Sequence, residues 1–310
     1  MPVAWFDFAP PLRHLPRPAD LQLPASAGGA EKTYSVDVDG RPVPFKFLRL
    51  GPPGRPVAAL LPGMGLTPVT FWGLGPYLFP THDLLLIDYA GLWTAARRPR
   101  GSLSLPMMAR AVWKTIAAVN AKNVSFLGSS MGGGLSLLCT LDVPPGVTVH
   151  KLALFNPACY PQELPSLYKM FRFPLLGEAM THFVPAQHLL AGLEQIGYVD
   201  KTKVPHELHA SYARDLGTPA GRRVLMELTR ELPADARALA PHTKRLGEIH
   251  QPVLIVWGLQ DPLLAPGTGR RLAADLPHAQ LLEFDNLAHM PHEESPERVG
   301  PAVGQFLAAR

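Results

Sequence analysis

Short apolar runs recur along the chain, and most are followed by a turn and then by a stretch with helical periodicity. Apolar runs of this length are typical of strands that are buried on both faces of a sheet. The runs are VAALL at 57–61, DLLLID at 83–88, NVSFLG at 123–128 and VHKLALFNP at 149–157. Residues 69–79 and 103–120 show the helical pattern between them. Strands that alternate with helices predict a parallel sheet with right-handed crossovers, and therefore an α/β fold.

The segment before the first buried run predicts an antiparallel pair. KTYSVDV and VPFKFLRL flank Asp39-Gly40, a dipeptide suited to a tight hairpin because glycine tolerates positive φ. We expect this hairpin at one edge of the sheet. Residues 1–30 are rich in proline, alanine and glycine, without a sustained period, and are expected to form an N-terminal arm.

From about residue 160 to residue 250 the alternation stops, and helix-like segments broken by prolines replace it. Strand-like PVLIVWG and AQLLEFD then resume the sheet, separated by a helix near 266–275 and followed by a C-terminal helix from about Pro296. The pattern divides the chain into an arm (1–30), the first part of a core (31–159), an inserted helical cap (160–250) and the second part of the core (251–310).

Composition narrows the class of protein. Hydrophobic residues make up 47% of the 310 positions, enough to bury a sizeable core, and no uncharged apolar stretch approaches a membrane span. The formal charge of +4 is small, and the basic run Arg97, Arg98 and Arg100 lacks interleaved aromatics, so nucleic acid is not an expected partner. Cys139 and Cys159 have no metal-binding spacing and are expected to be packing residues in a reducing, cytoplasmic protein.

The strongest chemical signal is Gly128-Ser129-Ser130-Met131-Gly132. This G-x-S-x-G stands directly between a buried-strand run and a helical pattern. A serine on such a strained strand-to-helix turn has its hydroxyl pushed out above the sheet, and the glycines avoid collisions with neighbouring backbone. Ser130 is therefore the candidate nucleophile, and Ser129 is expected to point into the core.

A serine nucleophile needs a base to take its proton and a third group to orient that base. Asp261, in GLQDPLLAP, follows the strand run VLIVWG and is the candidate acid. His289, in FDNLAHMPHEESPERV, lies just past the last predicted strand and is the candidate base. Ser130, Asp261 and His289 follow one another in the order that α/β hydrolases use.

With the segments LLPGMG, LLLIDYAG, FLGSSMGGG, VLIVWGLQDPLLAP and HMPHEESPE, the chain resembles the α/β-hydrolase fold superfamily over residues 33–160 and 250–310. The resemblance implies a mostly parallel α/β-hydrolase sheet flanked by helices, with an inserted helical cap. It also places the base at His289 rather than at His292, since in that family the histidine precedes an apolar residue and Pro-His-Glu.

The resemblance further implies an oxyanion hole formed by the backbone N–H groups of Met64 and Met131. The chain departs from its relatives here, because Pro62 stands where the family commonly has histidine. Asp88 is expected to anchor a loop. Asn156 ends a strand where some relatives place their acid, and its amide cannot stabilise an imidazolium by charge. Asp285 is expected to lie in a loop.

Several activities are compatible with this triad. We expect carboxylesterase-like hydrolysis of an ester, thioester or lactone, with hydrolysis of a carbon–carbon bond or perhydrolysis as alternatives. A ligand-binding receptor or scaffold that no longer turns over substrate is the alternative of another class. Ser130 in place of aspartate disfavours dehalogenase and epoxide hydrolase chemistry, and LPGMG does not match the glycine-rich loop of proline iminopeptidases.

The expected partner is a small apolar, ester-like molecule, because the predicted cap is rich in apolar side chains, although these can also pack the cap onto the core. Trp72, after the oxyanion loop, is assigned equally to the core or the pocket. No metal or organic cofactor is expected, since no H-E-x-x-H or similar ligand cluster is present. Activity is expected to rise with pH through one ionisation, because only a neutral imidazole accepts the serine proton.

Overall fold

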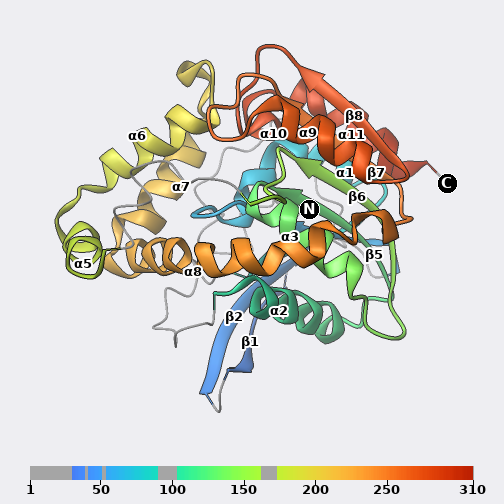
Figure 1. Ribbon diagram of the computed structural model, residues 1–310, viewed down its shortest axis with the longest axis horizontal. Helices are drawn as coiled ribbons and strands as arrows, with labels where there is room; N and C mark the ends of the chain where they lie inside the picture. Colours follow the sequence, from blue (N-terminus) through green and yellow to red (C-terminus); the bar gives the residue numbers. More distant parts are fainter. Residues whose placement is uncertain (1–29, 39–40, 51–53, 90–102, 162–172, 310) are drawn as a thin grey trace, which may run out of the picture.

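A computed structural model describes residues 30–38, 41–50, 54–89, 103–161 and 173–309 (Figure 1). Within them, eight strands form one sheet in the order β1-β2-β4-β3-β5-β6-β7-β8. The strands are β1 (Ala30–Val38), β2 (Arg41–Leu50), β3 (Val57–Leu61), β4 (Asp83–Asp88), β5 (Asn123–Ser129), β6 (Thr148–Phe155), β7 (Val253–Gly258) and β8 (Ala279–Phe284). Neighbours from β4 to β8 pair in parallel, so the predicted mostly parallel α/β sheet is confirmed.

The predicted hairpin lies at the edge of this sheet. β1 pairs antiparallel with β2 from Ala30 opposite Arg49 to Val38 opposite Arg41, and β2 pairs antiparallel with β4. The turn at Asp39-Gly40 and the arm expected over the first 29 residues lie outside the described residues.

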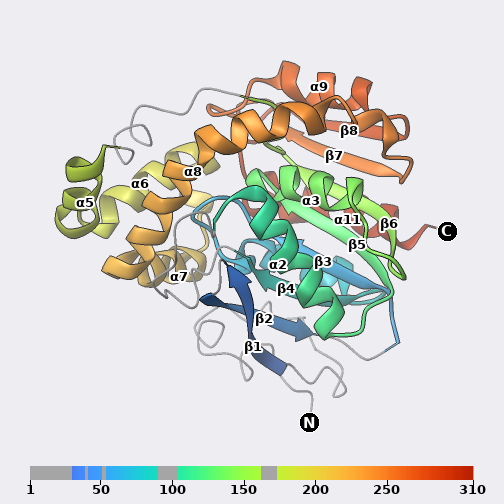
Figure 2. The same ribbon diagram turned by 60° about the horizontal axis from the view of Figure 1, so that its bottom comes forward.

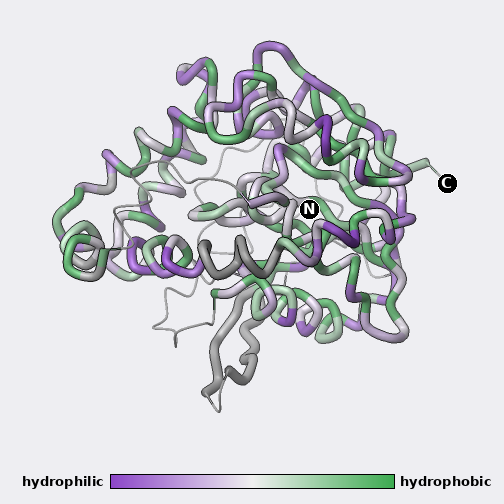
Figure 3. Tube along the Cα trace, in the orientation of Figure 1, coloured by the Kyte–Doolittle hydropathy of each residue, from purple (hydrophilic) through white to green (hydrophobic). Residues whose placement is uncertain are grey.

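Helices cover both faces of the sheet (Figure 2). The helices outside the β6–β7 connection are η2 (Pro68–Leu74), α1 (Gly75–Leu78), α2 (Leu105–Ala118), α3 (Met131–Leu141), α9 (Pro266–Asp275), α10 (Pro291–Glu294) and α11 (Pro296–Ala308). Along β3, Val57, Ala59 and Leu61 belong to a core cluster that includes α2, α3 and α9, whereas Ala58 and Leu60 belong to one that includes η2, α1 and α11. This alternation gives the sheet two apolar faces, and hydrophobic positions follow its central strands in Figure 3.

One predicted element takes another form. Residues 69–79 have helical periodicity but fold as the 3₁₀ helix η2 followed by the single turn α1. Gly73 packs so closely on Pro296 that an added Cβ would lie 2.6 Å from the proline Cβ. The tighter winding therefore accompanies close contact with α11.

Within the described part of the connection between β6 and β7, four α-helices project from one side of the sheet, at the left of Figures 1 and 2. They are α5 (Pro174–Phe183), α6 (Ala186–Gly197), α7 (His206–Gly217) and α8 (Pro219–Thr243), with the short η3 (Lys201–Lys203) and η4 (Leu246–Glu248). We call this segment the helical insertion. The predicted cap boundaries at 160 and 250 stay a prediction. No helix in the described ranges combines the length and apolar character needed to span a bilayer.

Parallel pairing gathers the carboxyl ends of six strands, β3 to β8, at one edge of the sheet, and five of them lead to candidate site residues. The loop with Met64 follows β3, Ser130 follows β5, Asn156 follows β6, Asp261 follows β7 and His289 follows β8. In open α/β sheets this edge is where ligands bind. The topology thus brings together residues that are far apart along the chain.

Candidate active site

Ser130 lies on a strained turn between β5 and α3. Its φ of 51° is in the left-handed region, which is costly for a residue other than glycine, and the side chain is 7% exposed. Its backbone N–H donates to Phe155 O at 2.9 Å, and its carbonyl accepts from Ala158 N at 2.9 Å. An added Cβ at Gly132 would lie 2.0 Å from Leu61 O, so only glycine fits there. The local fold therefore has the features expected of a nucleophile turn.

The loop after β3 approaches this turn. A Cβ added at Gly63 would lie 3.3 Å from Ser130 Cβ. Met131 is the first residue of α3, so its amide has no acceptor within the helix. Among the backbone hydrogen bonds of the described residues, neither the Met64 nor the Met131 N–H has an acceptor. Both amides thus keep their N–H without a recorded backbone acceptor in the described part of the chain.

Asp261 and His289 are in direct contact. His289 Nδ1 lies 2.6 Å from Asp261 Oδ2, and both side chains are buried. Asp261 Oδ1 accepts from the backbone N–H groups of Leu263 at 2.8 Å and Leu264 at 3.0 Å. No hydrogen bond is present between the described side chains of Ser130 and His289. Such bonds are often long without substrate.

Asn156 is a site residue whose contribution the sequence did not reveal. Its place at a strand end indicates only that its amide cannot replace the acid. In the structure its Nδ2 donates to Asp261 Oδ2 at 2.6 Å, the same oxygen that faces His289. The only available signal was an amide residue at the end of a buried strand.

His292 lies in the core rather than beside Asp261. Its ring packs against Phe71 and Phe155, with centroid separations of 5.1 and 4.8 Å, and its Nε2 lies 2.9 Å from Thr70 Oγ1. Burial, with a smaller contribution from the neighbouring His289, lowers the pKa of His292 to about 3. The ring is therefore neutral at ordinary pH.

Glu293 is a buried carboxylate with three hydroxyl donors. Thr70 and Tyr212 donate to Oε1, and Tyr198 donates to Oε2, the two tyrosine contacts measuring 2.5 Å. Thr70 has one hydroxyl hydrogen, which goes to Glu293, so it must accept from His292 Nε2–H. Burial raises the pKa of Glu293 against the opposing effect of these donors. The cluster joins η2, the turn α10 just after His289 and the helical insertion.

Backbone contacts strengthen this junction. Glu294 Oε1 accepts from the N–H groups of Val199 and Asp200, at 2.8 and 3.1 Å, and its Oε2 accepts from Ala288 N at 2.8 Å. His289 N donates to Ile196 O at 3.3 Å. The segment that carries the candidate base is therefore bonded, from His289 to Glu294, to the end of α6 and the two residues that follow Tyr198.

The structure also shows where the other residues discussed in the sequence lie. Trp72 belongs to the core cluster of the η2 face, and Asp88 is buried at the end of β4. Ser129 is fully buried, and its Oγ has no hydrogen-bond partner among the residues that the structure describes. Asp285 is exposed in a loop. Cys139 and Cys159 are buried free thiols, as predicted for packing residues.

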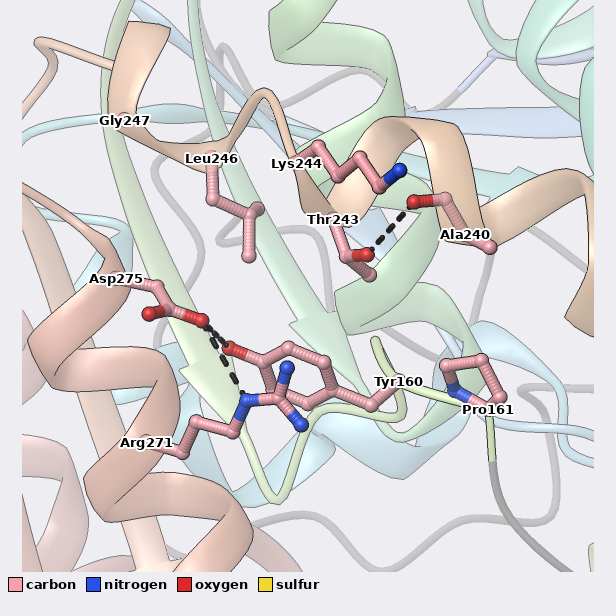
Figure 4. Close-up of a pocket in the computed structure, with 9 residues that line it drawn as sticks. All are labelled: Tyr160, Pro161, Ala240, Thr243, Lys244, Leu246, Gly247, Arg271 and Asp275. Atoms are coloured by element: carbon pink, nitrogen blue, oxygen red, sulfur yellow. Dashed lines mark hydrogen bonds and ion pairs between the residues drawn. The ribbon is translucent and has the colours of Figure 1, made fainter.

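A cleft of about 680 Å³ lies away from these residues, between the start of the insertion and α9 (Figure 4). The Tyr160 hydroxyl donates to Asp275 at 2.6 Å, and the Arg271 guanidinium stacks 4.0 Å from the Tyr160 ring centroid. The remaining lining residues are Pro161, Ala240, Thr243, Lys244, Leu246 and Gly247. These contacts anchor the chain leaving β6 onto α9. No cluster of three potential metal ligands occurs in the described ranges.

A family comparison agrees with this architecture. The model described as serine aminopeptidase, S33, a hydrolase family, matches residues 108–296, more than half of the chain. The chain belongs to this family. The matched range runs from α2 through the turn at Ser130 to the segment after His289, so the resemblance to α/β hydrolases is confirmed.

Individual relatives are distant but cover most of the chain. The uncharacterised hydrolase YugF of Bacillus subtilis (strain 168) is 22% identical over 82% of this chain and 91% of its own length. A 2-hydroxy-6-oxo-6-phenylhexa-2,4-dienoate hydrolase of Burkholderia cepacia is 24% identical over 80% and 84%. The structure of the enzyme of the same name from Rhodococcus sp. strain RHA1 superposes with a TM-score of 0.73 at 19% identity, covering 91% and 99%. This likeness confirms the fold.

Proposed function

We propose that the protein is a serine hydrolase that cleaves a carboxylic ester or a related acyl bond, such as a thioester or lactone. Ser130 is the nucleophile, His289 the base and Asp261 the residue that orients the base. The observation that carries the proposal is the 2.6 Å contact between His289 Nδ1 and Asp261 Oδ2, at the sheet edge where Ser130 lies on a left-handed turn.

Each group has a defined role in this proposal. Asp261 accepts a hydrogen bond from His289 Nδ1–H, which leaves Nε2 of His289 to take the proton of Ser130 as the hydroxyl attacks a carbonyl carbon. The carbonyl oxygen becomes an oxyanion that the Met64 and Met131 amides stabilise, together with the N-terminus of α3. The protonated His289 gives its proton to the leaving group. An acyl-enzyme forms, and water releases it by the same steps.

Carbon–carbon bond hydrolysis is the second candidate, because several relatives bear names of that chemistry. Two are the 2-hydroxy-6-oxo-6-phenylhexa-2,4-dienoate hydrolase and a 2-hydroxy-6-oxononadienedioate/2-hydroxy-6-oxononatrienedioate hydrolase of Comamonas testosteroni. These names describe small organic substrates. In our proposal residues 160–250 form a cap that covers such a substrate, supported by the bonding of α6 to the His289 segment.

The test compares neighbouring serines. Ser130→Ala should lower kcat/KM on p-nitrophenyl esters at least about a thousandfold and abolish labelling by a fluorophosphonate probe. Ser129→Ala is the matched control. Its hydroxyl is buried without a partner, so its removal should leave both readouts unchanged. Ester hydrolysis by Ser130→Ala above about a tenth of the wild-type rate contradicts the assignment. If the wild-type protein hydrolyses 2-hydroxy-6-oxo-6-phenylhexa-2,4-dienoate but no ester, the second candidate is favoured.

A further inference from the structure

We infer that Asn156 is a positioning residue that holds the Asp261 carboxylate toward His289. The inference deepens the proposed function and rests on it. Asn156 follows the last residue of β6, is fully buried, and has a φ of 40°. Asparagine tolerates this left-handed backbone better than most residues, yet the conformation still has a cost. A buried amide kept in that conformation indicates a specific use for the side chain.

The orientation of the amide is fixed by the backbone of β7. Asn156 Oδ1 accepts from the Gly258 N–H at 2.9 Å. Because a backbone N–H can only donate, the oxygen must face Gly258 and the NH₂ group must face the other way. Nδ2 therefore points at Asp261 Oδ2, at 2.6 Å. The opposite assignment would place two acceptors against each other.

Asp261 consequently receives hydrogen bonds from three directions. Its Oδ1 accepts from two amides of its own loop, and its Oδ2 accepts from His289 and from Asn156. Without Asn156, Oδ2 has His289 as its sole recorded protein donor, and nothing from β6 restrains the carboxylate. The Asn156 amide thus links the end of β6 to the acid on β7 and, through it, to the base after β8.

A positioning role has kinetic consequences. The amide acts through Asp261 and not on the substrate, so its removal should lower kcat and leave KM nearly unchanged. It also donates to the ionised form of the carboxylate, and so favours the anion that stabilises the imidazolium. A merely structural amide would alter stability without changing how activity or His289 responds to pH.

Two variants separate these roles. Asn156→Gly deletes the amide while keeping a residue that accepts positive φ, and Asn156→Asp keeps the shape but brings a second carboxyl against Asp261. Asn156→Gly should lower kcat about 10- to 100-fold, the range expected for one hydrogen bond to a charged group. Asn156→Asp should move the acid limb of kcat/KM to higher pH, because added negative charge favours the imidazolium.

Asn120→Gly is the matched control, since Asn120 also has positive φ (52°) but is exposed after α2. It should match wild type in every assay. Circular dichroism melts establish that each variant is folded, and if Asn156→Gly does not fold, the near-isosteric Asn156→Asp carries the test.

A readout independent of turnover is the proton NMR signal of the His289 Nδ1–H, assigned with His289→Gln, and its titration with pH. Asn156→Gly and Asn156→Asp should shift both. If both variants leave the signal, its titration and kcat as in wild type, the inference is overturned. Failure of the proposed function is a separate result, namely that Ser130→Ala keeps its activity.

Discussion

Two parts of the helical insertion are held by different kinds of contact: its inner end, next to the His289 segment, and its outer end, formed by α5. At the inner end, Tyr198 and Tyr212 donate to the buried Glu293, and backbone bonds tie α6 to the His289 segment. At the outer end, Leu175 and Phe183 of α5 are 88% and 83% exposed. Figure 1 shows α5 at the edge of the molecule, far from the sheet. Directed polar contacts thus hold one end, whereas the other leaves large apolar side chains in solvent.

The comparison distinguishes contacts that fix where the insertion lies from contacts that only bury apolar surface. Hydroxyl donors reach Glu293 only in one arrangement of η2, α7 and the end of α6, because hydrogen bonds need defined distances and angles. Apolar contacts tolerate small shifts far better. The inner end can therefore fix the insertion relative to the proposed base, and the outer end need not share in that task.

The largest expected effect is at the inner end. Glu293→Ala removes the acceptor of three buried hydroxyls and should lower the free energy of unfolding by about 3 kcal/mol or more. Urea unfolding followed by tryptophan fluorescence measures the change. Glu248→Ala is the control, because that carboxylate forms an exposed ion pair with Arg245 and its loss should cost less than about 1 kcal/mol. If both variants lost the same free energy of unfolding, the buried contacts of the inner end would be no stronger than an exposed ion pair, and the distinction between the ends would fail.

A smaller effect concerns pH. Because burial lowers the pKa of His292 to about 3, the unfolded chain binds its proton first as the pH falls. Stability should therefore decrease below about pH 6.5, by up to about 1.4 kcal/mol per pH unit for this group. His82, whose pKa burial lowers to about 4, acts in the same direction. The raised pKa of Glu293 has the opposite sign, since the native state then binds that proton more readily, and it offsets part of the loss.

Urea midpoints at several pH values between 4 and 7 measure this slope. His292→Gln keeps a donor for Thr70 and should flatten the curve. His188→Gln changes an exposed histidine of α6 and should leave the curve parallel to wild type. A wild-type slope retained by His292→Gln would assign the acid sensitivity to other groups.

The smallest effect is expected at the outer end. Phe183→Ser and Leu175→Ser replace side chains that are already exposed, so the free energy of unfolding should change by no more than about 0.5 kcal/mol. Activity on short esters should be unchanged. A loss above about 1.5 kcal/mol in thermal or urea unfolding would show that α5 packs against the rest of the protein as firmly as α7 does.

The strands were predictable because their signals are local. The runs at 57–61 and 83–88 coincide with β3 and β4, and the helix expected at 266–275 coincides with α9. Continuous apolar runs bounded by glycine, proline or aspartate leave few alternatives. Residues 69–79, expected to form one helix, fold as η2 and α1, and Gly73 there packs closely on the distant Pro296, a contact that no local pattern reveals.

The candidate site likewise contains residues that local motifs predict and residues that they do not. Ser130, Asp261 and His289 stand in motifs that can be read along the chain, and their assignment stays a proposal. Asn156 and Glu293 could not be assigned, because their partners lie far away in sequence. Asn156 is 105 positions from Asp261, and Glu293 is 81 positions from Tyr212. An amide or carboxylate in a sequence does not reveal which distant donor or acceptor it meets.

The insertion between β6 and β7 also orders events during synthesis. Leu152 pairs with Val253 only after the ribosome has released the whole insertion, and closing so long a connection makes this a late step of folding. The strained turn at Ser130 can form on β3, β5 and β6 well before Asp261 and His289 have left the exit tunnel. A nascent chain then carries a serine with no base beside it. If the proposed triad is correct, hydrolysis begins only once β7 and β8 have joined the sheet and brought Asp261 and His289 to Ser130.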